Sequence, residues 1–124
     1  MGHDGIIIIL ILGLIAFDII TGLIKAVQLG EFSSREMRAG LLRKSGTIFL
    51  VALAYGLQYA AALLPELPEE LGVVFNGVAL YVVLMEAASV VENILQINPD
   101  LGGDKIRGFF GLNHNEPEGD TNEN

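Results

Sequence analysis

Long apolar runs alternate with short charged segments along this chain of 124 residues. The first run covers residues 5–24, where Asp18 is the only charged side chain, and the second covers residues 45–64, which carry no charge. A third run begins at Leu71 and admits Glu86 and Glu92 before it ends near residue 95. Because a helix rises about 1.5 Å per residue, twenty residues span roughly 30 Å, the thickness of the hydrocarbon core. The pattern predicts three transmembrane helices, at residues 5–24, 45–64 and 71–95.

The segment between the first two runs, residues 25–44, is polar and basic. Gly30 predicts the end of the first helix, and Ser33 followed by Glu36 forms a capping box that begins another. From Ser34 onward, apolar side chains alternate with basic ones, a pattern typical of a short amphipathic helix at the lipid headgroups. A solvated connector with helical propensity explains the same residues. The basic side chains expected at this interface are Arg35, Arg38, Arg43 and Lys44.

The basic residues also predict an orientation. All seven Lys and Arg residues lie in the 25–44 loop or in the C-terminal tail, and none lies before residue 25 or in the acidic turn at residues 65–70. Cytoplasmic segments carry the excess of Lys and Arg, so the loop and the C-terminus are expected in the cytoplasm and the N-terminus outside. We expect residues 1–97 to form a membrane domain and residues 98–124 a cytoplasmic tail that is largely disordered after residue 113.

Composition narrows the function. The net charge of −8 and the absence of a basic stripe argue against nucleic acid as a partner. The chain has no cysteine, which removes disulfides and thiolate metal sites. His3 and His114 lie in the leader and the tail, with no neighbouring set of catalytic or ligating side chains. We therefore expect an all-α integral membrane protein without enzyme activity, metal or cofactor.

Acidic side chains within the spans need an explanation, because each costs about 2.5–3.5 kcal/mol on insertion scales. Asp18 shares a helical face with Gly22 and Lys25, and Glu86 shares one with Ser89 and Asn93. Asp18 can pair with Lys25 along its own face or face another subunit. For both acids, a hydrogen bond or ion pair within the bundle and a position beside water remain alternatives. In either case, one side of each helix is expected to face protein or water instead of lipid.

The second span carries small residues at four-residue spacing, Ala52, Gly56 and Ala60. A ridge of small residues lets another helix approach closely in a membrane. Such patterns are also common by chance in alanine-rich helices, so the ridge is a weak indication of a packing surface.

Several short motifs follow one another in a fixed order: Asp18-x-x-Thr21-Gly22-x-x-Lys25-Ala26, Gly30-x-x-Ser33-Ser34, Met37-Arg38-x-Gly40-Leu41-x-x-Lys44 and Ser89-Val90-Val91-Glu92-Asn93. Together they resemble the bacteriophage holin family that also contains the clostridial toxin-secretion holins. The resemblance reaches from about residue 6 to residue 97. It ends after Asn98, where an acidic tail stands in place of the Pro-rich and basic segment of many members.

The resemblance implies a membrane protein that forms homo-oligomers in the bacterial inner membrane. Such oligomers form lesions that dissipate the proton-motive force and release endolysin, or a large toxin, with no direct binding to endolysin required. The residues implied in subunit or pore contacts are Asp18, Thr21, Gly22, Lys25, Glu86, Ser89, Glu92 and Asn93. The alternatives are a small ion channel or transporter subunit, for which intramembrane acids are the usual mark, and a membrane adaptor that recruits a soluble partner.

Overall fold

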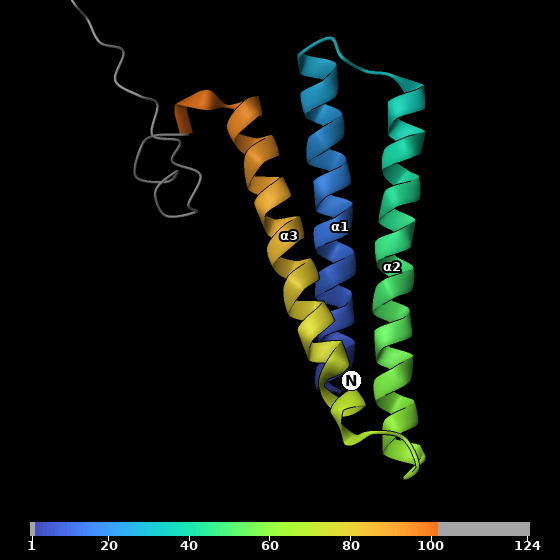
Figure 1. Cartoon of the computed structure of the whole chain (residues 1–124). Coiled ribbons are helices and arrows are strands. Elements are labelled where there is room, and N and C mark those ends of the chain that lie inside the picture. Colours follow the sequence, from blue (N-terminus) through green and yellow to red (C-terminus); the bar gives the residue numbers. More distant parts are fainter. Residues whose placement is uncertain (1, 102–124) are drawn as a thin grey trace, which may run out of the picture.

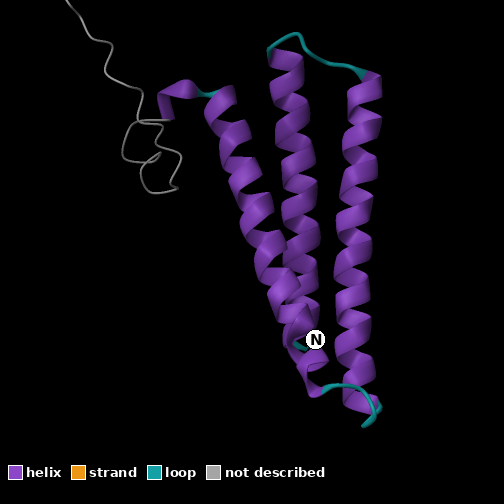
Figure 2. Ribbon diagram, in the orientation of Figure 1, coloured by secondary structure: helices purple, strands orange, loops and turns teal. Residues whose placement is uncertain are grey.

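Three long helices form the part of the chain that the structure, a computed structural model, describes, residues 2–101 (Figures 1 and 2). They are α1 (His3–Gln28), α2 (Ser34–Leu63) and α3 (Val74–Ile97). The short 3-10 helices η1 (Glu69–Val73) and η2 (Pro99–Leu101) flank α3. Each long helix, α3 together with η1, is long and apolar enough to cross a membrane. The predicted all-α architecture with three spans is confirmed.

The bundle has two distinct ends (Figure 1). The start of α1 and the α2–α3 connection lie at one end, which we call the N-terminal end. The α1–α2 connection and the last turn of α3 lie at the other, which we call the loop end. The predicted tail after residue 101 and its disorder fall outside the described residues.

The largest difference between the predicted and observed helix boundaries concerns α2. α2 runs without a break from Ser34 to Leu63, so the structure shows no separate helix at residues 34–44. Nothing between Lys44 and Ser45 ends a helix, and one interior glycine, Gly46, weakens a helix by about 1 kcal/mol relative to Ala without breaking it. The basic segment is therefore continuous with the predicted second span.

The connection between α1 and α2 follows the predicted signals. Gly30 has a φ of 70°, and the Glu31 N–H donates to the Ala26 carbonyl at 2.8 Å, a bond that closes a Schellman motif. Ser33 then caps α2, with its hydroxyl accepting from the Glu36 N–H at 3.4 Å. A left-handed glycine and a serine cap thus reverse the chain within a few residues.

Replacing Gly30 with alanine should destabilise the protein by about 1 kcal/mol, because a Cβ disfavours the left-handed conformation. Gly46→Ala is the matched control: its Cβ meets no atom within 4 Å, and alanine is the better helix former. Thermal unfolding of the purified variants in detergent measures both effects. Equal or opposite shifts would contradict this account of the turn.

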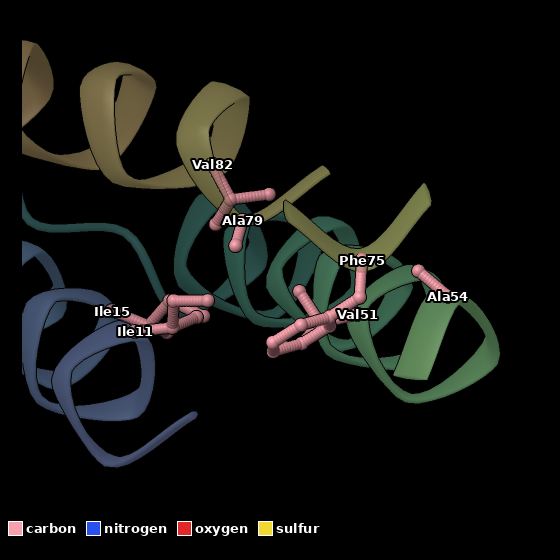
Figure 3. Packing of buried hydrophobic residues seen from close by; sticks show 7 residues of the cluster. All are labelled: Ile11, Ile15, Val51, Ala54, Phe75, Ala79 and Val82. Carbon is pink, nitrogen blue, oxygen red and sulfur yellow. The ribbon is translucent and has the colours of Figure 1, made fainter. Parts of the chain in front are cut away.

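A small apolar core fills the half of the bundle nearer the N-terminal end (Figure 3). Phe75 of α3 is fully buried and meets Tyr55 of α2 edge-on, with ring centroids 5.4 Å apart. α3 packs along both α1 and α2, whereas α1 and α2 touch each other little. The other members of the core are Ile11, Ile15, Val51, Ala54, Ala79 and Val82.

Most of the remaining outer surface is apolar, as suits helices surrounded by lipid. Leu42 and Phe49 on α2 are 72% and 71% exposed, and Leu80 on α3 is 62% exposed. The chain therefore presents apolar side chains outward and, as described next, keeps several polar side chains inside.

Candidate functional site

A network of polar side chains joins all three helices between the apolar core and the loop end. Asp18 of α1 is its centre and is 7% exposed. Its Oδ1 accepts hydrogen bonds from the Ser89 hydroxyl at 2.7 Å and the Asn93 amide at 2.8 Å, both on α3. Its Oδ2 lies 2.5 Å from the Lys44 Nζ of α2. One carboxylate thus receives donors from two other helices.

Lys44 bridges two acids from different helices. Its Nζ lies 2.5 Å from the Asp18 Oδ2 and also 2.5 Å from the Glu86 Oε2 of α3. Because both carboxylates contact one nitrogen, Asp18 and Glu86 lie at the same level of the bundle. They contact protein within a single chain, which is one of the two alternatives that the sequence left open.

Lys44 was expected among the interfacial basic side chains, and the structure directs its side chain to Asp18 and Glu86. Lys44 lies within a continuous α2, on the same face as the core residues Val51 and Tyr55, at spacings of seven and eleven. Buried carboxylates without a counter-ion are costly, and the long lysine side chain reaches inward to supply one. The helical spacing between Lys44 and these inward-facing residues is visible in the sequence. It could have distinguished Lys44 from Arg35, Arg38 and Arg43, which are exposed.

Asn93 ties the network to the next turn of α1. Its amide donates to the Thr21 hydroxyl at 3.1 Å and to the Asp18 carbonyl at 3.3 Å. The Thr21 hydroxyl in turn donates to the Phe17 carbonyl at 2.9 Å. Gly22 lies beside the same amide: a Cβ placed on Gly22 would be 3.6 Å from the Asn93 Nδ2. The polar face of α1 and the polar face of α3, both noted in the sequence, therefore contact each other.

Other residues singled out in the sequence lie outside this network. Lys25 is half-buried near the loop end, and Asp18 pairs with Lys44 in its place. Glu92 is exposed. The small-residue ridge does not pack closely against another helix: Ala52 is exposed and borders the open groove between α1 and α2, and a Cβ on the exposed Gly56 would meet nothing within 4 Å.

Glu86 is the most deeply buried charged side chain among residues 2–101, at 1% exposed. Its Oε2 contacts Lys44, but its Oε1 has no hydrogen-bond partner. One ammonium therefore serves two carboxylates, and a buried acceptor left unpaired costs about 1–3 kcal/mol. The described part of the chain contains no cluster of three or more side chains suited to hold a metal ion.

A second polar contact, which the sequence did not reveal, lies at the N-terminal end. The Gln58 amide of α2 donates to the Asp4 Oδ2 of α1 at 3.1 Å, and the Gln58 Oε1 is buried without a partner. A lone glutamine in an apolar run gives no indication of its partner, so only the packed helices identify this pair.

Replacing Asn93 with leucine should weaken the packing of α1 against α3 by about 1–3 kcal/mol, because Asp18 and Thr21 lose a buried donor. The control variant Glu92→Leu changes the neighbouring exposed residue and should weaken the packing of α1 against α3 much less. Proteolysis of membranes containing each variant, followed over time, compares the two. Equal protection of the two variants would contradict a structural role for the Asn93 amide.

Comparison with known proteins bears on this arrangement. Comparison with curated proteins and with solved structures finds no match. Residues 1–103 match the bacteriophage holin family, which covers all three helices and every residue of the network. The chain therefore belongs to the bacteriophage holin family.

Proposed function

We propose that this holin assembles in the bacterial inner membrane into lesions that dissipate the proton-motive force and release endolysin at a set time. The observation that carries the proposal is the network of Asp18, Lys44 and Glu86, enclosed by a bundle whose outer surface is mostly apolar. A chain that satisfies its polar groups internally can accumulate in lipid without conducting. The same groups are suited to contact water once helices rearrange in an assembly.

The energetics support two arrangements of the same helices. Against lipid, exposed carboxylates and ammonium groups are costly, so a dilute chain keeps them inside. In a crowded membrane, neighbouring chains provide protein contacts and a shared interior can admit water. The exposed Gly56 on α2, with nothing within 4 Å of its Cβ position, offers a neighbour close approach. We propose that rising density shifts the balance from the closed bundle to the assembly.

The proposed orientation places the loop end in the cytoplasm and the N-terminus outside. It rests on the bias of Lys and Arg toward the α1–α2 connection and the tail. In that orientation the Asp18–Glu86 level lies in the cytoplasmic half of the membrane. An assembly would then carry its acids near the inner mouth.

Inducing the chain in bacteria with and without a cytoplasmic muralytic enzyme tests the function. We expect abrupt growth arrest in both cultures and lysis only in the culture that contains the enzyme. Passage of a folded enzyme needs a protein-sized opening, which an ion channel of fixed size does not provide. Growth arrest without lysis in the presence of the active enzyme would overturn the proposal in favour of ion conduction.

A further inference from the structure

The seam between α1 and α2 contains an open cavity at the loop end. Its volume is about 370 Å³, within the range of about 300–1,000 Å³ that small ligands occupy. The cavity extends from the α1–α2 connection down to the level of Asp18 and Lys44. Apolar side chains such as Leu23 and Leu41 line it beside charged ones. It therefore lies where the hydrocarbon core meets the headgroup layer.

The charged side chains around this cavity have both signs. Lys25 and Arg43 supply two cations, and Glu31 and Glu36 supply two carboxylates. Within residues 2–101, none of these four takes part in an ion pair. Lys44 and Asp18 also reach the cavity but already pair with each other. The groups that remain available to a ligand thus sum to zero charge.

A second groove, lined by aliphatic side chains and Tyr55, lies further along the same seam. It has a volume of about 230 Å³ and is lined by side chains of α1 and α2 that include Leu12, Ile48 and Ala52. A single acyl chain is narrow enough to enter it.

We propose that the α1–α2 seam binds a zwitterionic phospholipid of the phosphatidylethanolamine class. Its phosphate pairs with Lys25 and Arg43, its ammonium pairs with Glu31 and Glu36, and one acyl chain lies in the apolar groove. An anionic lipid would satisfy the cations and leave both carboxylates beside its negative headgroup. The zero net charge of the available groups therefore selects a headgroup that carries both charges. The bound lipid would fill the space between two helices that barely touch.

Native mass spectrometry of the full-length protein, released from detergent with equal amounts of phosphatidylethanolamine and phosphatidylglycerol of the same acyl chains, tests the proposal. The wild type should retain phosphatidylethanolamine preferentially. The variant K25Q/R43Q should lose about tenfold in its binding, because charge-assisted bonds to phosphate are removed. The variant E31Q/E36Q should reverse the preference toward phosphatidylglycerol, since only cations remain.

The matched control is R35Q/R38Q, which removes two exposed charges from the same stretch of α2 outside the cavity lining. It should keep the wild-type lipid preference, and circular dichroism should give equal helix content for all four proteins. Equal retention of the two lipids by the wild type would overturn the proposal, as would an equal loss in the control. Dimers that disappear in K25Q/R43Q while lipid binding persists would also overturn it, and would assign the seam to a second copy.

Discussion

Replacing Lys44 with methionine is expected to destabilise the bundle by about 3–5 kcal/mol, the largest effect of any single substitution in the network. The substitution leaves the buried carboxylates of Asp18 and Glu86 facing each other without the ammonium that lies 2.5 Å from both. Two unpaired acids in a membrane interior favour any arrangement that exposes them to water. Thermal unfolding in detergent should show the loss of stability, and induction in bacteria should show early growth arrest or failure to accumulate.

Two comparisons separate the ion network from a general effect of removing a lysine. Lys25→Met changes the same residue type near the same end of the bundle and should cost far less, because Lys25 has no ion pair among the described residues. Adding D18N and E86Q to the Lys44 variant removes the unbalanced charges and should restore much of the stability. If Lys44→Met and Lys25→Met behave alike, Lys44 does not act as the shared counter-ion.

Much of the fold follows from local signals in the sequence. Apolar runs long enough to cross a bilayer predicted the three spans, and Gly30 and Ser33 marked the turn between α1 and α2 correctly. These signals are readable because backbone geometry and hydrocarbon thickness act on each segment separately. The sequence also predicted that the acidic faces of α1 and α3 avoid lipid, but not that they contact each other.

The partners of the buried acids were not predictable in the same way. Lys25 lies on the helical face of Asp18, so local spacing suggested it as a partner, yet the packed helices place Lys44 there. A cation at the edge of a basic segment has the same local sequence whether it points to water or to a buried acid. The choice depends on where α2 lies relative to α1 and α3. The pairing of Asp4 with Gln58 is hidden for the same reason.

The division of the bundle into two halves gives these contacts a functional meaning. Nearer the N-terminal end, the core is apolar and includes the fully buried Phe75, whereas toward the loop end the contacts are mostly polar. Apolar contacts between helices gain little over contacts with lipid, while polar contacts have a distinct alternative in water. We therefore expect the polar half to determine when the bundle opens.

Replacing Asp18 with leucine tests that expectation, and it should change the time of lysis sharply. The substitution leaves the Ser89 hydroxyl without its acceptor, at a cost of about 1–3 kcal/mol, and removes one partner each from Asn93 and Lys44, which keep Thr21 and Glu86. The closed bundle loses stability relative to an assembly, so growth arrest should come earlier after induction. Time to arrest, abundance in the membrane fraction and cross-linked oligomers should be measured together, because equal abundance excludes a simple failure to insert.

Two variants distinguish the role of Asp18 from that of any acid in the helices. Asp18→Asn keeps the shape and one acceptor oxygen for Ser89 and Asn93 but loses the pair with Lys44, so its arrest time should fall between wild type and Asp18→Leu. Glu92→Leu removes an exposed acid from α3 and should leave the time of arrest nearly unchanged. If Asp18→Leu reaches wild-type abundance with normal timing and normal oligomers, the polar network does not hold the bundle closed. The switch must then lie elsewhere, with the exposed Gly56 on α2 as the next position to vary.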